Sequence, residues 1–238
     1  MAPQVIVDKP PGLAEALAGR FVDEARKALD ARRLFAVALP GGSVADRFFP
    51  RLAETALDWS RVHFFWGDER AVPPTDPESN YRAARTLWLE PAGVPAASVH
   101  RMEAEAPDAE AAARAYADTL TRVLGSPPRL DLVLLGVGPD GHVCSLFPGH
   151  PLLGEEGRLV AVVEDSPKPP ARRMTLTLPA LAAAGLVVVA ALGGSKAEVV
   201  REALEGAGSE LPLARVVRRA RRCVFYLDDA AAAGVGRG

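Results

Sequence analysis

Hydrophobic and polar residues alternate along this 238-residue chain in two different patterns. Near-continuous apolar runs are typical of strands buried in a parallel sheet. Between these runs, apolar residues recur at helical spacing. The alternation predicts an α/β fold, in which a mostly parallel sheet is flanked by helices in a Rossmann-like arrangement. We predict strands at 5–7 and within 34–42, 61–70, 130–138, 159–165, 172–178, 186–192 and 223–228, and helices at or near 13–29, 43–55, 81–89, 107–124, 193–206 and 214–220.

The chain length fits one large domain, and neither an internal repeat nor a flexible linker divides it. We therefore predict a single α/β domain over residues 1–238, with the proline-rich loops 71–80 and 164–173 as excursions. Lys and Arg number 28 and Asp and Glu 30, for a net charge of -2. This balance lacks the basic excess expected of a protein with a nucleic-acid partner. The longest apolar run, at 181–194, is too short to cross a bilayer, so no membrane partner is expected.

The two cysteines, Cys144 and Cys223, are far apart and form no C-x-x-C pair. Neither a zinc site nor a disulfide framework is therefore expected. Reduced cysteines favour a cytoplasmic location. The sequence leaves open whether the protein is a monomer or a small homo-oligomer.

Four short polar segments each follow a predicted strand. They are PGGS at 40–43, GDER at 67–70, GPDGH at 138–142 and GGSK at 193–196. In open α/β sheets, ligands bind beyond the carboxyl ends of the strands. We therefore expect the four segments to converge on one edge of the sheet and to form the binding site there.

Residues 136–141, GVGPDG, match the G-x-G-x-x-G pattern of dinucleotide-binding proteins. That pattern requires a helix that begins within the glycines, so that its N-terminus meets the pyrophosphate. Here a Pro-Gly turn at 148–149 follows closely, and the segment lies past the middle of the chain. We therefore predict no nucleotide cofactor and interpret the segment as a catalytic loop.

Asp140 and His142 flank Gly141 in this loop. A carboxylate beside an imidazole fixes the imidazole tautomer and raises its basicity, as suits a general base. The alternative is that Asp140 caps a turn and that His142 forms hydrogen bonds only within the loop. The three other polar segments expected at the same edge favour the catalytic interpretation.

Five segments together resemble the 6-phosphogluconolactonases: VALPGGS, FFWGDER followed by VP and SNY, LLGVGPDGHVCSLFPG, RRMTLTLPAL and GGSKAEVV. They occur in the family order and spacing over nearly the whole chain. The resemblance implies a fold similar to that of sugar-phosphate isomerases, and neither a cofactor nor a metal. It also implies hydrolysis of a phosphorylated sugar lactone, 6-phospho-D-glucono-1,5-lactone, to 6-phosphogluconate in the pentose phosphate pathway.

A phosphate is bound by backbone N–H groups at a helix start and by cationic side chains. Gly41, Gly42 and Ser43 would supply the backbone groups, with the Ser43 hydroxyl at the helix start. The alternative is an ordinary glycine turn in which Ser43 caps the helix. Lys196 is expected at the start of another helix, where a bound anion would offset the unfavourable helix dipole.

The resemblance also places Arg70 close to the phosphate, although a salt bridge to Asp68 or Glu69 is the alternative. Asp68 is expected to bind sugar hydroxyls or to orient Arg70. Asn80 suits the same polar role, with an Asx turn as its alternative. Arg173 is expected to close over the substrate or to lie on the surface.

In the predicted mechanism, His142 takes a proton from the water that attacks the lactone carbonyl and returns it to the ring oxygen, while Asp140 orients His142. Glucosamine-6-phosphate deaminases are the nearest alternative, but they usually carry Tyr at the position of Arg70 and Glu at that of Phe147. A non-catalytic sugar-phosphate-binding protein is a second alternative.

One departure from the lactonase pattern follows the histidine, where the family more often has Thr and Ala and this chain has Val143 and Cys144. A hydroxyl beside His142 is therefore absent, and Cys144 is expected to be a small packed residue. His63, His100 and His150 belong to no motif and are expected to be structural.

Overall fold

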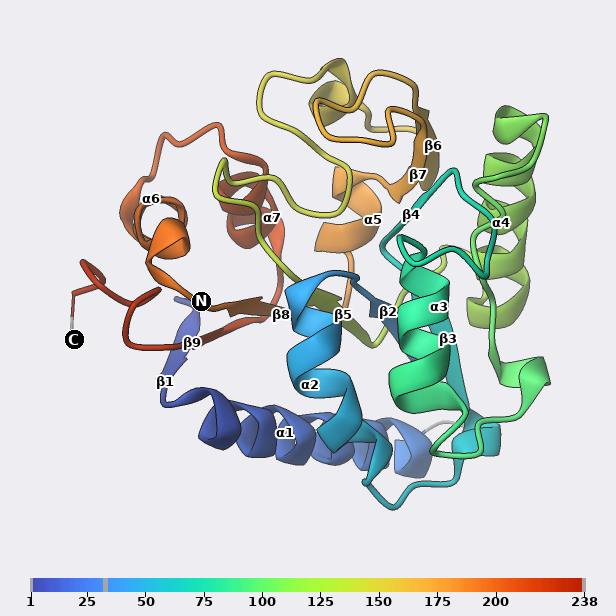
Figure 1. The fold of residues 1–238 in the computed structure, drawn as a ribbon, viewed down its shortest axis with the longest axis horizontal. Helices are drawn as coiled ribbons and strands as arrows, with labels where there is room; N and C mark the ends of the chain where they lie inside the picture. Colours follow the sequence, from blue (N-terminus) through green and yellow to red (C-terminus); the bar gives the residue numbers. More distant parts are fainter. Residues whose placement is uncertain (1, 32–33, 237–238) are drawn as a thin grey trace.

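Six parallel strands form the central sheet of the computed structural model, which describes residues 2–31 and 34–236. The strands lie side by side in the order β1-β9-β8-β5-β2-β3 (Figure 1). The predicted α/β fold with a mostly parallel sheet is therefore confirmed. The bounds are β1 Gln4–Val7, β2 Phe35–Leu39, β3 Val62–Trp66, β5 Leu132–Leu135, β8 Leu186–Ala191 and β9 Cys223–Leu227.

A second sheet of three antiparallel strands was not predicted. It comprises β4 Asp68–Arg70, β7 Arg173–Leu176 and β6 Val160–Val163, in that order. The segment 61–70, predicted as one strand with a polar tip, is divided at Gly67, where the chain leaves the central sheet. The Gly67 N–H donates to the Leu39 carbonyl (2.9 Å), and the Gly67 carbonyl accepts from the Leu176 N–H (2.7 Å). Gly67 therefore joins the two sheets.

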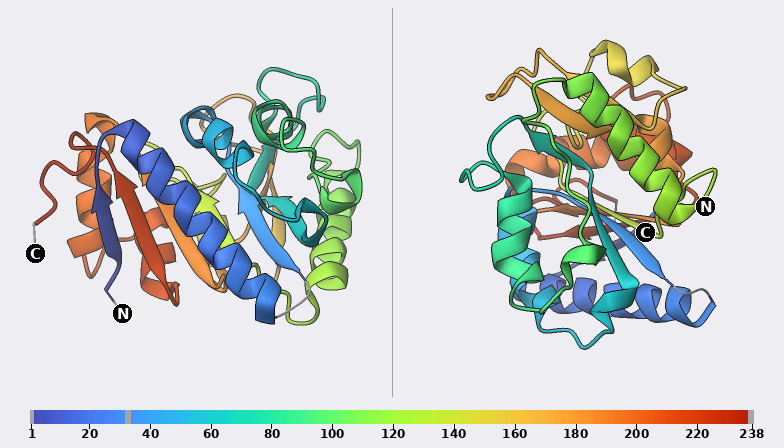
Figure 2. Two further views of the ribbon diagram at one scale, coloured as in Figure 1. Left: turned by 90° about the horizontal axis from the view of Figure 1, so that it is seen from below. Right: turned by 90° about the vertical axis from the view of Figure 1, so that its right-hand side faces the viewer.

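Helices cover both faces of the central sheet (Figures 1 and 2). The first three pack together on one face, the last three pack together on the other, and the fourth packs against β6 of the small sheet. Their bounds are α1 Pro10–Ala31, α2 Ser43–Ala53, α3 Asn80–Ala84, α4 Ala109–Leu124, α5 Leu178–Ala182, α6 Ala197–Glu205 and α7 Pro212–Arg219. Short 3₁₀ helices lie at Trp59–Arg61, Ala96–Ser98, Pro151–Gly154 and Gly194–Lys196, and a π-helical turn at Arg85–Leu89.

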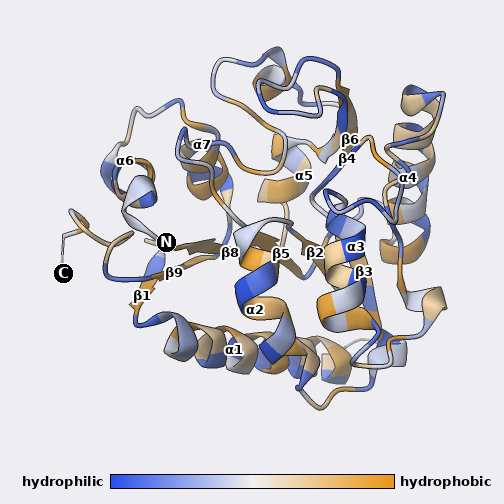
Figure 3. Cartoon of the chain, in the orientation of Figure 1, coloured by the Kyte–Doolittle hydropathy of each residue, from blue (hydrophilic) through white to orange (hydrophobic). Residues whose placement is uncertain are grey.

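The inner strands are apolar along their whole length because helices cover them on both sides. Every residue of β2, β5, β8 and β9 is buried. Figure 3 shows the complementary pattern on α1, α2 and α4, which carry both polar and apolar residues. Beneath α1, the ring of Trp88 lies 5.1 Å from that of Phe21 and 5.2 Å from that of Phe64. This packing holds α1 and the turn around Trp88 against β3.

Several helix starts differ from the predictions, and α5 lies outside the predicted helix ranges; two of the differences concern capping. Gly42, at φ +64°, is the N-cap of α2, and no side chain caps this helix, so the alternative in which Ser43 is the cap is wrong. The positive φ of Gly42 lets the chain turn directly from the end of β2 into the helix. The helix predicted from residue 107 begins at Ala109, because the Asp108 carboxylate accepts from the Ala111 N–H (2.8 Å).

Candidate active site

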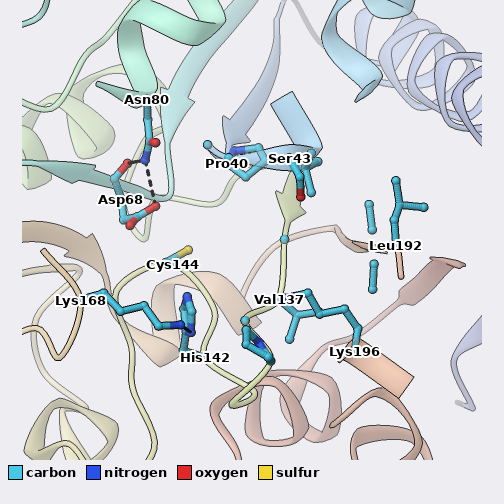
Figure 4. Close-up of a pocket in the computed structure, with 18 of the residues that line it drawn as sticks. Pro40, Ser43, Asp68, Asn80, Val137, His142, Cys144, Lys168, Leu192 and Lys196 are labelled. Atoms are coloured by element: carbon cyan, nitrogen blue, oxygen red, sulfur yellow. Dashed lines mark hydrogen bonds between the residues drawn. The ribbon is translucent and has the colours of Figure 1, made fainter. Parts of the chain in front are cut away.

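A pocket of about 280 Å³ lies where the carboxyl ends of the central strands meet the small sheet (Figure 4). All four polar segments contribute to its walls, as the sequence predicted. Of the ten predicted site residues, all except Asp140 line it, and Asp140 contacts His142 from behind. The predicted residues in the walls are Gly41, Gly42, Ser43, Asp68, Arg70, Asn80, His142, Arg173 and Lys196.

His142 and Asp140 form a hydrogen-bonded pair at the pocket floor. The Nδ1 atom of His142 lies 2.5 Å from Oδ1 of Asp140. A carboxylate only accepts, so Nδ1 carries the proton and Nε2 keeps a free lone pair. The loop is closed by hydrogen bonds from Gly138 N–H to the His142 carbonyl (2.9 Å) and from Gly141 N–H to the Gly138 carbonyl (3.0 Å). The geometry thus presents an unprotonated ring nitrogen, as a general base requires.

Glycine is needed at two positions of this loop. Gly141 has φ +81°, a conformation that side chains disfavour. A Cβ on Gly138 would lie 1.9 Å from Nδ1 of His142, so any side chain there would overlap the imidazole. The glycines of GVGPDG therefore make room for the histidine. Residues 137–150 form turns and an isolated bridge, so the helix that a dinucleotide fingerprint requires is not there.

Burial lowers the pKa of the His142 imidazole, and the charge of Lys168 lowers it further, while the hydrogen bond to Asp140 raises it. Asp140 therefore raises the basicity of His142 as expected, but burial outweighs this effect and the net shift of the His142 pKa is downward. For Asp140, burial acts to raise the pKa, but the contact with His142 and the charge of Lys168 outweigh it and lower the pKa. At neutral pH the pair therefore consists of a neutral imidazole and a carboxylate.

Lys168 is a pocket residue that the sequence analysis missed. Its Nζ lies 3.4 Å from Oδ2 of Asp140 and 3.2 Å from Nδ1 of His142. It belongs to the loop between β6 and β7, and Figure 4 shows its side chain reaching toward His142. A lysine flanked by prolines in a surface-type loop carries no periodic signal, so nothing local in the sequence places it beside the pair.

Asp68 joins the two walls of the pocket. It is 6% exposed, and its carboxylate accepts from Ser145 Oγ (2.7 Å) and from Asn80 Nδ2 (3.3 Å). Its ion-pair contact is Arg173 NH1 at 4.0 Å, so the expectation that Asp68 orients Arg70 is wrong. Arg173 is also 6% exposed, which contradicts a surface location. Asp68 and Arg173 are therefore buried members of one network at the junction of the sheets.

Glu69, buried behind the pocket, fixes the positions of Arg70 and Asn80. Its Oε1 accepts from the backbone N–H groups of Arg70 and Asn80 (both 2.8 Å). Its Oε2 accepts from Tyr81 N–H (2.7 Å) and Ser79 Oγ (3.0 Å). The Arg70 guanidinium donates to the Glu78 carbonyl. The alternative for Arg70, a salt bridge to Asp68 or Glu69, is therefore wrong. Asn80 begins α3, so the Asx turn is wrong as well.

The glycine segment after β2 provides open space. Nothing lies within 4 Å of a Cβ placed on Gly42, and Figure 4 shows the Ser43 hydroxyl pointing into the pocket. The neighbouring Gly41 has a different role, because a Cβ there would lie 1.7 Å from Oδ1 of Asn80. That buried amide oxygen accepts no hydrogen bond within the described residues. The start of α2 thus has room for a ligand on one side and holds the Asn80 amide on the other.

Positive charge dominates the pocket walls. Lys196 occupies the N-cap position of α6, as predicted at a helix start, and no side chain caps that helix. Burial lowers the pKa of Lys196, and the charge of Lys168 adds to this effect. Of the lining residues, Arg70, Lys168, Arg173 and Lys196 are cationic, and Asp68 is the carboxylate among them. Two helix starts and four cations form a site suited to a doubly charged anion.

The departures from the lactonase pattern lie against the histidine. Val143 is fully buried and Cys144 has φ +51°. Burial raises the pKa of the Cys144 thiol well above its usual range, so the thiol is packed and not a thiolate. The ring of Phe147 lies 4.9 Å from that of His142, at the position where the deaminases usually carry Glu. His63 and His100 contact one another, and His150 contacts Asp165, all outside the pocket.

Fold and site together define an α/β protein with a cationic pocket at the carboxyl ends of its central strands. The sequence profile of the family described as glucosamine-6-phosphate isomerases/6-phosphogluconolactonase matches residues 8–225, and the chain belongs to this family. It is 41% identical to the 6-phosphogluconolactonase of Streptomyces coelicolor, over 99% of this chain and 95% of that protein. The 6-phosphogluconolactonase structure from Trypanosoma brucei superposes with a TM-score of 0.86 at 29% identity, covering 98% and 99% of the two chains.

A monomeric glucosamine-6-phosphate deaminase has the same fold, with a TM-score of 0.82 at 21% identity over 98% and 99% of the two chains. Fold alone therefore does not separate the two activities, and the residues beside His142 must do so.

Proposed function

We propose that the protein hydrolyses 6-phospho-D-glucono-1,5-lactone to 6-phosphogluconate, the reaction named for the Streptomyces coelicolor relative. The observation that carries the proposal is the His142–Asp140 pair, whose unprotonated Nε2 belongs to a side chain lining a strongly cationic pocket. The pocket thereby combines a base for ester hydrolysis with a site for the substrate phosphate.

In the first step, His142 Nε2 removes a proton from water while the water oxygen attacks the lactone carbonyl carbon. The carbonyl oxygen takes the negative charge of the tetrahedral intermediate. When that intermediate collapses, the bond between the carbonyl carbon and the ring oxygen breaks, and the imidazolium returns its proton to the ring oxygen. A positioned base contributes about 10²–10⁴-fold to such a rate. Asp140 stabilises the imidazolium and holds the ring in the required tautomer.

The substrate phosphate is assigned to the side of the pocket between the starts of α2 and α6. Gly42 and Ser43 supply backbone N–H groups there, and Lys196 and Arg70 supply charge-assisted hydrogen bonds. Asp68 lies close to Cys144, on the side of His142, where it suits sugar hydroxyls (Figure 4). The Asn80 amide donates to Asp68 and lies against Gly41, so we assign it to the region between the sugar and the phosphate. Anchoring the phosphate orients the lactone carbonyl over His142.

Deamination with isomerisation, the second candidate activity of this fold, requires further acid–base groups. Phe147 packs against His142 where the deaminases usually have a carboxylate, and it cannot transfer a proton. This contact favours hydrolysis. The retained catalytic pair also disfavours a non-catalytic sugar-phosphate-binding protein.

The proposed reaction uses no metal and no cofactor. Within the described residues, no three His, Cys, Asp and Glu side chains cluster as metal ligands would. No helix in the described ranges is long and apolar enough to cross a membrane. A cytoplasmic location, a single domain, and a monomer or small homo-oligomer remain part of the proposal.

The deciding experiment measures loss of 6-phosphogluconolactone by the purified protein, corrected for spontaneous hydrolysis, with glucosamine 6-phosphate as a parallel substrate. Hydrolysis of the lactone without release of ammonia from the amino sugar is expected. Ammonia release with an unchanged lactone rate would assign the chain to the deaminases instead.

A further inference from the structure

The loop between β6 and β7 places a lysine against the catalytic pair, and neither the motifs nor the mechanism above gives it a role. Lys168 Nζ lies 3.4 Å from Asp140 Oδ2 and 3.2 Å from His142 Nδ1. Its side chain is 41% exposed, so it approaches the pair from the solvent side. The Asp140 carboxylate therefore has the imidazole on one oxygen and an ammonium on the other.

This position is fixed by the backbone, because both ends of the lysine residue are held. Ser166 Oγ accepts from the Lys168 N–H (3.2 Å) and donates to the Lys168 carbonyl (2.8 Å). The buried Arg173 guanidinium donates to the carbonyls of Lys168 (3.1 Å), Pro169 (2.9 Å) and Pro170 (3.1 Å). A surface loop with a freely moving lysine would need none of these bonds, which together fix the point from which the side chain extends.

The hydrogen-bonding chemistry defines what the ammonium does. Nδ1 of His142 already donates to Asp140 and has no lone pair left, so the ammonium cannot donate to it. Its acceptor is Asp140 Oδ2, and its charge stands beside the ring that becomes positive during the reaction. We propose that Lys168 is a positioning residue that holds Asp140 against His142 and disfavours the imidazolium form of the base.

Two consequences follow for the reaction. Before attack, the ammonium keeps His142 neutral and ready to accept the proton of water. After attack, it makes the imidazolium a stronger acid, which favours return of the proton to the ring oxygen. Three charged groups face His142: Asp140 and Lys168 in contact, and Asp68 at longer range. Burial and Lys168 lower the pKa of the imidazole, whereas the two carboxylates raise it.

The test compares Lys168→Met with Lys168→Arg, and with Lys9→Met, a matched change at an exposed lysine outside the pocket. The first readout is an NMR titration of the His142 imidazole, whose signal is identified by its loss in His142→Gln. The pKa of His142 should rise in Lys168→Met and stay close to the wild-type value in Lys168→Arg and Lys9→Met. Circular dichroism and thermal unfolding verify that each variant is folded.

The second readout is the pH dependence of kcat/KM, and it rests on the proposed lactone hydrolysis. In Lys168→Met the acid limb of the kcat/KM profile should move to higher pH. At a pH on that limb, kcat/KM should fall roughly 10-fold, because the lost charge is partly exposed but lies close to the imidazole. The loss should be equal for phosphorylated and unphosphorylated lactone. Lys168→Arg should restore most of the rate.

An unchanged His142 pKa in folded Lys168→Met would overturn the proposal. So would a rise in KM confined to the phosphorylated lactone, which would make Lys168 a phosphate ligand. Because the titration needs no substrate, it decides the role of Lys168 even if the wild-type protein fails to hydrolyse the lactone, and that failure would count against the proposed function alone.

Discussion

Replacing Glu69 should separate the scaffold of the pocket from its chemistry. The side chain is 3% exposed and accepts four hydrogen bonds, from the N–H groups of Arg70, Asn80 and Tyr81 and from the Ser79 hydroxyl. Burial raises the pKa of this carboxyl, and the four donors oppose that rise. Three of the four donors are backbone N–H groups, so Glu69 ties the loop 71–79 to the end of β4 through hydrogen bonds that only an acceptor oxygen can make.

Glu69→Gln keeps the shape but turns one acceptor oxygen into an NH2 group that faces two donors. A hydrogen bond to a charged acceptor contributes about 1.5–3 kcal/mol, so losing two lowers the free energy of unfolding by about 3–6 kcal/mol. For a protein of this size each kcal/mol lowers Tm by about 2–4 °C, which predicts a fall of at least about 6 °C. Because Arg70 and Asn80 lose their anchor, KM for the phosphorylated lactone should also rise.

The assay is urea unfolding followed by tryptophan fluorescence, together with kinetics on the variant at a temperature where it remains folded. Glu78→Gln is the matched control, since Arg70 contacts the Glu78 backbone carbonyl and not its carboxylate. The control should unfold like the wild type. A loss for Glu69→Gln of less than about 1 kcal/mol, the size of a typical single neutral hydrogen bond, would refute this account of the loop.

Four further predictions concern the reaction itself. His142→Ala should lower kcat by at least about 10²-fold with little change in KM, and near-normal turnover would exclude it as the base. Because burial, reinforced by Lys168, lowers the pKa of His142 and only the neutral ring accepts a proton, kcat/KM should fall toward low pH with a midpoint below 6.5; a midpoint above that value would contradict the assignment. Arg70→Ala and Lys196→Ala should each raise KM for the phosphorylated lactone by about 10- to 100-fold and spare the plain lactone, whereas equal losses on both substrates would place these residues in the fold or the chemistry. Chelator should leave activity unchanged, and NAD or NADP should not raise Tm; a rise of several degrees at millimolar nucleotide would restore the dinucleotide hypothesis.

The central sheet could be predicted because its strands are buried on both faces, which leaves an apolar run in the sequence at each of β2, β5 and β8. The small sheet could not. Its pairing of Asp68–Arg70 with residues 173–175 joins segments over 100 positions apart, and the signal for the change of sheet is a single glycine, Gly67. Local periodicity reports burial, and it does not report which distant strand is the partner.

The pocket residues also divide into those that local sequence predicts and those that depend on contacts between distant segments. Residues in glycine-rich segments after apolar strands, such as His142 and Ser43, were predicted because strand ends converge on one edge. Lys168 and Glu69 were not, because their roles depend on contacts across the junction of the sheets. The pairing of Asp68 with Arg173 in place of Arg70 was missed for the same reason, since Arg173 belongs to β7, over 100 positions further along the chain.

Because the chain passes from the central sheet to the small sheet at Gly67, the pocket residues are divided between the two sheets. His142 and both helix starts extend from the central sheet, whereas Arg70, Lys168 and Arg173 extend from the small sheet or the loop entering it. Substitutions in β4 can therefore change the charge of one wall of the pocket while the backbone that carries His142 stays the same.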